Sequence, residues 1–275
     1  MCIRDRPKGE IQNPLLALWE GRAKEMQFFG ERIDIKMWFY VVGGTMLSLN
    51  ALSGAVWHTD QPGDVNPGVW FYAAFMTFYV FDYFIFERVQ LYTYDLIHEH
   101  LGFKLWWGGL LVYGWLFIIP LWGMAAHPDP DISGGWRYFW LTGATALFVI
   151  GWTISRGANL QKYMFKRFPD RHFLGLIEPT YIQAGDRKIL TSGFWGAARH
   201  FNYLGEGFLC IGIALVFGHF AVLWAWTYAI FVITFFTFRQ RFDEKECAQK
   251  YGPEKWAEYQ EKIPKHTQHL SLIHI

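Results

Sequence analysis

The densest group of side chains that could do chemistry lies in one stretch, Leu190–Glu206. Glycines let a ligand approach the backbone closely, an indole offers a stacking plane, and amide and phenol groups can bind an amide or ribose edge. An aromatic belt at a membrane surface would explain the Trp and Tyr but not the Arg-His-x-Asn-Tyr run. The stretch therefore predicts a ligand site. Its polar and aromatic members are Trp195, Arg199, His200, Asn202, Tyr203 and Glu206.

A second candidate is the pair Lys162 and Lys166, four residues apart in a run with helical character. On a helix these two ammonium groups share one face, which suits a phosphate monoester or a diphosphate. A basic cluster beside a membrane that meets anionic lipid headgroups has the same pattern. Both interpretations stay open from the residues alone.

Carboxylates inside apolar sequence form a third group. Asp82 lies within an apolar run, and Glu87 follows about one turn later, near the end of that run. A carboxylate buried in a membrane is costly and indicates function, or a polar partner on a neighbouring helix. Asp82, with Glu87 beside it, is therefore a candidate functional residue, and pairing with an Arg, Tyr or Trp of a neighbouring span is the structural alternative.

The C-terminal segment that begins at Arg239 mixes acids, bases and aromatics over Asp243, Cys247, Lys250, Tyr251 and Tyr259. An amphipathic helix on the membrane surface would explain part of this pattern but not its acid–base mixture. Three widely spaced cysteines give neither a disulfide framework nor a zinc-binding spacing, so no metal site is expected. Neither a Rossmann nor a P-loop glycine motif is present.

The elements that position these residues are apolar helices. The chain has 275 residues, of which 52% are hydrophobic and 18% charged, against about 25% charged in ordinary soluble domains. Most of its apolar stretches approach the roughly 20 residues that cross a bilayer as a helix. The sequence predicts an all-α, multi-pass membrane bundle of about six spans, the last two forming a tight hairpin at Gly218-His219. The six stretches are 37–57, 69–86, 105–126, 136–155, 207–217 and 220–238.

Basic residues alternate between successive loops and predict the orientation of the spans. Of the 25 Lys and Arg residues, 24 lie in segments 1–36, 87–104, 156–205 and 239–275. The loops 58–68 and 127–135 hold none. Because basic loops stay on the cytoplasmic side, both termini are expected there, in the endoplasmic reticulum or a bacterial inner membrane. The net charge of +1 gives no indication of nucleic-acid binding, and the bilayer is the expected partner.

Two regions follow from this pattern. Residues 1–36 are expected to form a cytoplasmic N-terminal segment, and residues 37–275 a membrane domain. Within that domain a long cytoplasmic loop, 156–206, and the C-terminal segment 239–275 are the expected places for a ligand. The first few residues and the last few do not share the pattern of their neighbours, and we interpret them as not belonging to the natural sequence.

Two long stretches together resemble the signatures of the sterol reductase family. This family includes the Δ14-, Δ7- and Δ24(28)-sterol reductases and the sterol reductase half of the lamin B receptor. Leu190–Glu206 is similar to LLxSGWWGxxRHxNYxGD, with Phe194 for the first Trp and Glu206 for the Asp. Asp243–Tyr259 is similar to DExxCxxKYGxxWxxY, with one extra residue before Trp256. The resemblance extends from about Asn13 to Pro264.

The resemblance implies NADPH as cofactor and reduction of a sterol double bond, above all one of the Δ14 type, by protonation followed by hydride transfer. It implies that Lys162 and Lys166 meet phosphate, and that the other members of both signatures line the cofactor. Those members are Leu190, Trp195, Arg199, His200, Asn202, Tyr203, Arg239, Asp243, Cys247, Lys250, Tyr251 and Tyr259.

The sequence departs from the family where a proton donor would be expected. The stretch that begins Gly108-Gly-Leu-Leu-Val-Tyr has Gly109 in place of the family's Asp and Phe117 in place of its Tyr. Tyr113 lies one turn before Phe117 and is a possible substitute. The candidate acids, in order of preference, are Asp243, Asp82, Glu87 and Tyr113.

Two other classes of protein remain as alternatives. Isoprenylcysteine carboxyl methyltransferases, which bind S-adenosylmethionine, share a similar C-terminal layout. However, Phe201-Asn202 stands here where they have Pro. A non-catalytic sterol-binding membrane protein is the second alternative, favoured by the missing Tyr and Asp but not by the cofactor signatures.

Overall fold

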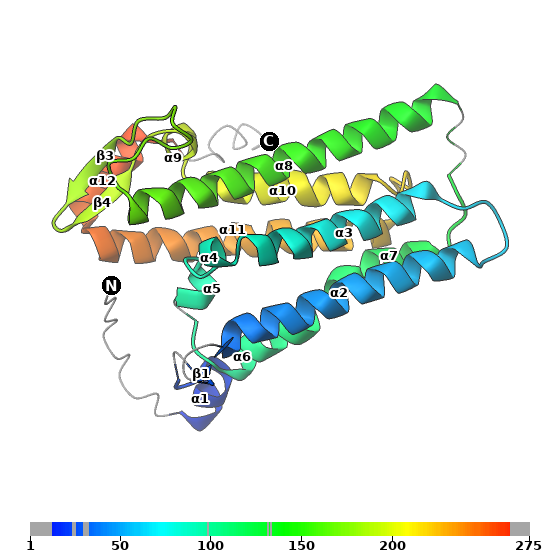
Figure 1. The fold of residues 1–275 in the computed structure, drawn as a ribbon, viewed down its shortest axis with the longest axis horizontal. Helices are drawn as coiled ribbons and strands as arrows, with labels where there is room; N and C mark the ends of the chain where they lie inside the picture. The colour runs from blue at the N-terminus through cyan, green and yellow to red at the C-terminus, as the bar shows by residue number, and fades with distance from the viewer. Residues whose placement is uncertain are drawn as a thin grey trace, which may run out of the picture. The chain divides into compact units, whose positions relative to one another are not determined.

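The computed structural model describes residues 13–23, 26–29, 33–97, 99–130, 132 and 134–264, and the described chain is mostly helical (Figure 1). The end residues that we interpreted as non-natural lie outside these ranges. The chain divides into two compact units, each considered by itself: Met1–Pro62 with Ala73–Ala126, and Gly63–Tyr72 with His127–Ile275. Helix α3, Pro67–Ile85, contributes to both units.

The first unit is built on helix α2, Ile35–Thr59, which begins where Asp34 caps the backbone N–H groups of Lys36 and Met37. Lys36 is buried and donates to the carbonyls of Leu96 (3.0 Å) and Glu99 (2.7 Å), which ties the start of α2 to the end of α5. The other elements, besides α3, are α1 Pro14–Glu20, β1 Gln27–Phe28, β2 Ile33–Asp34, α4 Glu87–Gln90, α5 Tyr94–Ile97, α6 Phe103–Trp106, η1 Trp107–Val112, η2 Leu116–Ile118 and α7 Ile119–Ala125.

The predicted third span is irregular. After α6 the chain takes a π-helical turn, η1, then a 3-10 turn, η2, before α7 resumes the α-helix. A side chain at Gly43 of α2 would lie 1.9 Å from the carbonyl oxygen of Gly109, so the two backbones touch at these glycines. The π turn therefore packs where only glycine fits.

The second unit contains three long helices: α8 Gly135–Arg167, α10 Phe201–Leu215 and α11 Leu223–Tyr251. Helices α8 and α10 approach closely, because a side chain at Gly205 would lie 2.5 Å from the backbone nitrogen of Ser155. Small residues let membrane helices pack in this way. Between α8 and α10 lie an antiparallel hairpin, β3 Tyr181–Ala184 and β4 Arg187–Leu190, and the short helix α9 Phe194–Ala197; α12 Pro253–Lys262 follows α11.

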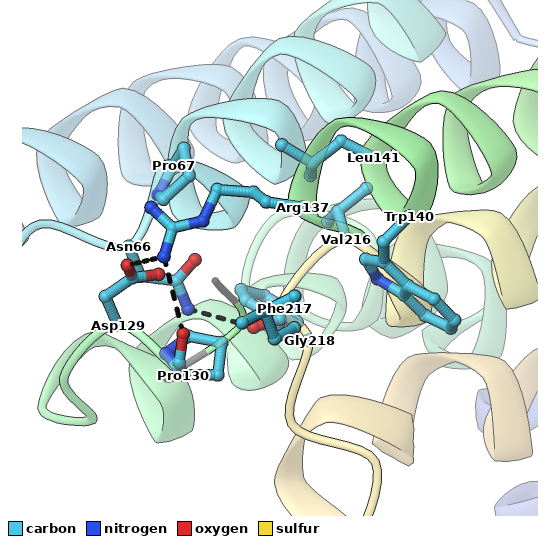
Figure 2. A pocket seen from close by; sticks show the side chains of 11 residues that line it. Asn66, Pro67, Asp129, Pro130, Arg137, Trp140, Leu141, Val216, Phe217 and Gly218 are labelled. Carbon is cyan, nitrogen blue, oxygen red and sulfur yellow. Dashed lines mark hydrogen bonds and ion pairs between the residues drawn. The ribbon is translucent and has the colours of Figure 1, made fainter. Parts of the chain in front are cut away.

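Helix α10 ends early, and side chains satisfy the carbonyls that its end exposes. Its 15 residues cover only about 22 Å. The Trp140 indole donates to the Leu215 carbonyl (2.7 Å), and the Asn66 amide donates to the Phe217 carbonyl (3.0 Å). Asn66, Trp140 and Phe217 line a small pocket beside the turn, where Gly218 has a positive φ of 73° (Figure 2). Unsatisfied carbonyls would be costly at membrane depth, so these bonds allow the chain to turn here.

Arg137, the remaining basic residue outside the four basic segments, lies in the same pocket. Its guanidinium forms an ion pair with Asp129 (Figure 2). Arg137 does not follow the alternation of basic and non-basic loops, and its charge is neutralised by this ion pair.

Helix α2, helix α3, the segment Phe103–Ala125 and helix α8 are long and apolar enough to cross a membrane. They correspond to the first four predicted spans, and the multi-pass helical class is confirmed. The fifth predicted span is a shorter helix, and α11 is apolar only in its first half. Within the residues that the structure describes, four helices rather than six have the length and composition of a full span. The hairpin turn at Gly218 is confirmed, since it separates α10 from α11.

Part of the segment predicted as a long cytoplasmic loop, 156–206, is helical, because α8 continues to Arg167 and α10 begins at Phe201. Its cytoplasmic location stays a prediction. Charged residues on one face of a helix do not end it. The chain is also not purely α-helical, since β3 and β4 pair in this region and β1 pairs with β2.

Candidate functional site

The polar end of the second unit carries the candidate site. Figure 1 shows β3, β4, α9 and α12 gathered at the end of the bundle where α8 finishes and α10 begins. Helix α8 has 33 residues and is about 50 Å long, whereas the hydrocarbon core of a bilayer is about 30 Å thick. Because its apolar part ends near Ser155, a bilayer crossed by that part would leave the segment 156–167 outside. The part of α11 after Phe238 is likewise rich in charged residues.

Gln161 anchors the glycine turn of the first signature to α8. Its side chain is 2% exposed, donates from Nε2 to the Ser192 carbonyl (3.0 Å) and accepts at Oε1 from the Phe194 N–H (3.0 Å). Gly193, between these two residues, has a φ of 59°, and a side chain there would lie 2.3 Å from Gln161 Nε2. The turn thus requires glycine for its conformation and for space.

Trp195 is also bonded to α8, about one turn before Gln161. Its indole Nε1 donates to the Ala158 carbonyl (2.8 Å), and the Lys162 ammonium lies 5.1 Å from the centre of its ring. A hydrogen bond at one edge and a cation over the face fix the orientation of the indole plane. The predicted stacking residue and the first predicted lysine are therefore neighbours.

A cationic cluster follows from the helical spacing of the lysines. Lys162 and Lys166 lie one turn apart on α8, and Lys250 of α11 lies close enough to affect the pKa of Lys166. Loss of hydration, together with the positive charges of Lys162 and Lys250, lowers the pKa of Lys166 to about 7. An anion with more than one negative charge would relieve this repulsion.

The start of α10 brings Asn202 and Tyr203 to α8 and α11. The Tyr203 hydroxyl donates to the carboxylate of Asp243, and its ring stacks on Phe236 at 4.5 Å. Asn202 Nδ2 donates to Asn159 Oδ1 (3.4 Å), while Asn202 Oδ1 is buried and accepts no hydrogen bond from the described residues. A buried acceptor without a donor is unusual in a folded protein and fits a site that a ligand completes.

Sequence reasoning missed Glu244, although it follows Asp243 directly. Its carboxylate accepts hydrogen bonds from both partners of the Arg-His pair, Arg199 Nη1 (3.1 Å) and His200 Nε2 (3.2 Å). It also accepts from Trp256 Nε1 (3.3 Å) and Gln260 Nε2 (2.7 Å). Burial by itself would raise the pKa of Glu244, but the bond from His200 and the charge of Arg199 outweigh it and lower the pKa to about 2.

Helix α12 and the hairpin share a small hydrophobic core. Ile182, Ile189 and Trp256 are buried in it, and Cys247 and Tyr251 pack against it. Burial raises the pKa of the Cys247 thiol and that of Tyr251, the latter to about 12, so both groups are neutral at pH 7.

The remaining predicted cofactor residues lie at the margin of this core. Tyr259 is buried in it, and its hydroxyl donates to the Trp195 carbonyl (3.5 Å). Leu190, at the end of β4, is buried beside the glycine turn. Arg239 lies on α11 with its guanidinium 5.5 Å from the Phe235 ring, one turn before Asp243.

The other three candidate acids belong to the first unit. Asp82 is buried, whereas Glu87 is exposed at the start of α4, where a carboxylate suits the helix N-terminus. Tyr113 is buried among Tyr40, Tyr83 and Phe117, and its hydroxyl makes no hydrogen bond to the described residues.

The fold and this cluster of polar side chains define a multi-pass helical membrane protein with a candidate ligand site at one end of the second unit. Residues 12–270 match the family described as "Ergosterol biosynthesis ERG4/ERG24 family". The chain belongs to this family, so the resemblance seen in the two signatures is confirmed.

Named relatives agree with this assignment. The chain is 33% identical to a Delta(14)-sterol reductase of Arabidopsis thaliana, over 90% of the chain and 63% of the relative. It is 32% identical to a Delta(14)-sterol reductase of Methylotuvimicrobium alcaliphilum, over 84% and 53%, and 33% identical to Delta(14)-sterol reductase TM7SF2 of Mus musculus, over 74% and 46%. The chain thus spans about half to two thirds of the length of these relatives.

Proposed function

We propose that this chain carries the cofactor-binding part of an NADPH-dependent sterol reductase, and that the substrate is a sterol with a C14 double bond. The observation that carries the proposal is the polar end of the second unit, where both family signatures meet around Trp195, Asn202 and Asp243. The names of the three relatives support the type of reaction.

The residues at the polar end of the second unit suit the chemistry of nicotinamide adenine dinucleotide phosphate. Lys162, Lys166 and Lys250 would hold its phosphates, Trp195 offers a plane for one of its rings, and Asn202 Oδ1 is an acceptor that still needs a donor. When bound, the cofactor supplies a hydride. The chain's own residues would orient it and exclude water.

The proton must come from a group in contact with the sterol. Asp243 is our first candidate as the acid or as the group that positions it. Its carboxylate accepts a hydrogen bond from the Tyr203 hydroxyl, and this contact supports the positioning role. Asp82, Glu87 and Tyr113 remain the other candidates. The apolar interior of the bundle suits a rigid polycyclic lipid and a reaction that must avoid water.

The first test compares NADPH, NADH and S-adenosylmethionine as stabilisers of the detergent-solubilised protein. A ligand at 100 times its dissociation constant stabilises by about 2.7 kcal/mol, and we expect this from NADPH. Trp195→Ala and Asn202→Ala should fold and lose the stabilisation, whereas the exposed Tyr181→Ala should keep it. Stabilisation by S-adenosylmethionine alone would favour a methyltransferase and overturn the proposal.

Turnover is tested with membranes that contain the protein, NADPH and a Δ14-unsaturated sterol. We expect NADPH oxidation to match the loss of the double bond, and Asp243→Ala to fold but not to turn over. Sterol binding without NADPH oxidation by the wild type would indicate a non-catalytic sterol-binding protein. Full activity of Asp243→Ala would exclude Asp243 as acid or positioning residue.

A further inference from the structure

Glu244 connects two segments of the candidate site that are far apart in sequence. Its four donors come from the turn before α10 (Arg199 and His200) and from α12 (Trp256 and Gln260). The Glu244 side chain is 16% exposed, and that of Arg199 is 7% exposed. A carboxylate shielded in this way must keep its donors in place, since losing one leaves a buried polar group unpaired.

His200 connects Glu244 to the proposed reacting groups. Its ring stacks on the Tyr203 ring, with centres 5.4 Å apart and planes 14° from parallel. Tyr203 in turn donates to Asp243. A continuous path therefore leads from Glu244 through His200 and Tyr203 to Asp243, and it returns to its start because Asp243 and Glu244 are adjacent on α11.

The backbone conformation of His200 explains why these contacts are required. His200 has a φ of 56°, a left-handed conformation that is unfavourable for residues other than glycine. It immediately precedes α10, so its conformation sets the direction in which Asn202 and Tyr203 leave the turn. The bond from its ring to Glu244, together with the bond from the Arg199 N–H to the Pro264 carbonyl (3.0 Å), holds the turn in this form.

We infer that Glu244 is a positioning residue that acts through His200 to hold the Tyr203–Asp243 pair in its working geometry. It does not touch substrate or cofactor itself. The inference rests on the proposed function for its effect on turnover, but its structural part can be measured without turnover.

The test uses Glu244→Gln, Tyr203→Phe, the double variant, and Glu258→Gln as control. A glutamine at position 244 keeps the shape and one acceptor oxygen but places an NH₂ group against donors. Glu258 is an exposed carboxylate of the same unit that pairs with Lys255 on the surface of α12. The kcat for sterol reduction and the dissociation constant of NADPH are measured for each protein.

We expect Glu244→Gln to lower kcat tenfold or more and to change NADPH affinity less than threefold, with Glu258→Gln unchanged. Because both single variants disturb one path, the double variant should be no slower than the slower single variant. If the two losses multiply, Glu244 and Tyr203 act independently and the inference is wrong. A wild-type kcat in Glu244→Gln refutes it equally.

Hydrogen exchange separates this inference from the proposed function. We expect faster exchange of the backbone amides of residues 201–205 in Glu244→Gln, with the rest of α10 and α11 protected as in the wild type. That result would support the positioning role of Glu244 even if the wild type reduced no sterol. In that case only the proposed function would fail. Unchanged exchange at 201–205, or loss of protection throughout the chain, would overturn the positioning role.

Discussion

Replacing Gln161 by leucine tests whether one buried amide holds the glycine turn of the site. The substitution preserves volume but removes the donor to the Ser192 carbonyl and the acceptor of the Phe194 N–H, both at 3.0 Å. Each buried backbone group left unpaired costs about 1–3 kcal/mol, and burying a more apolar side chain offsets part of the total. We therefore expect the free energy of unfolding to fall by about 2–4 kcal/mol.

The same change should weaken cofactor binding. The turn that Gln161 holds leads directly into Trp195, whose indole is bonded to α8 only one turn from Gln161. Release of the turn should raise the dissociation constant of NADPH at least tenfold, about 1.4 kcal/mol. The assays are denaturant unfolding in detergent and NADPH titration of the same preparations.

Two further variants complete this experiment. Gln183→Leu changes an exposed glutamine of β3 and should alter stability by no more than about 0.5 kcal/mol. Gln161→Glu keeps an acceptor for Phe194 but sets a carboxylate oxygen against the Ser192 carbonyl, so it should cost as much as leucine. If Gln161→Leu matched the wild type in stability and in NADPH affinity, the amide would not be what holds the turn.

Three more predictions follow from charges and close contacts. As the pH rises from 6 to 8, Lys166 loses its proton, so NADPH affinity should fall. In Lys166→Arg, which stays charged, titration with NADPH should not show this fall. The pKa of Glu244 is about 2 in the folded state, against 4.5 ordinarily. Its contribution to stability is therefore complete above pH 4.5 and is lost as the pH falls from 4.5 to 2. The free energy of unfolding of Glu244→Gln should lack this pH dependence. Gly205→Val places a side chain 2.5 Å from the Ser155 nitrogen and should lower stability by about 1–3 kcal/mol or more, whereas Gly207→Ala, with open space around it, should be neutral or stabilising in the same unfolding assay.

The sequence was sufficient to predict the membrane helices, because an apolar run of about 20 residues without charge is rare outside a membrane. It did not show how far α8 and α10 extend beyond the apolar stretches 136–155 and 207–217, since the residues that lengthen these two helices are mostly polar or charged. The β3–β4 hairpin was overlooked although its signal was present. Gly185-Asp186 between alternating residues such as Ile182 and Ile189 is a hairpin pattern.

The site was predicted in part. The signatures indicated Trp195, Tyr203 and Asp243, and the fold brings their segments together at one end of the second unit. Glu244 could not be found from spacing, because its donors lie up to 45 residues away and their convergence depends on the tertiary fold. The roles of these residues towards a cofactor remain predictions.

Helix α8 is unbroken from Gly135 to Arg167, so a tilt of its apolar half also moves its polar end. Its apolar half responds to the thickness of the surrounding bilayer by tilting, as membrane helices do. Lys166 lies about 30 Å along the helix from the middle of that half, so a tilt of about 10° would displace it by about 5 Å. The position of the cationic end of α8 relative to the membrane surface therefore depends on the thickness of the bilayer.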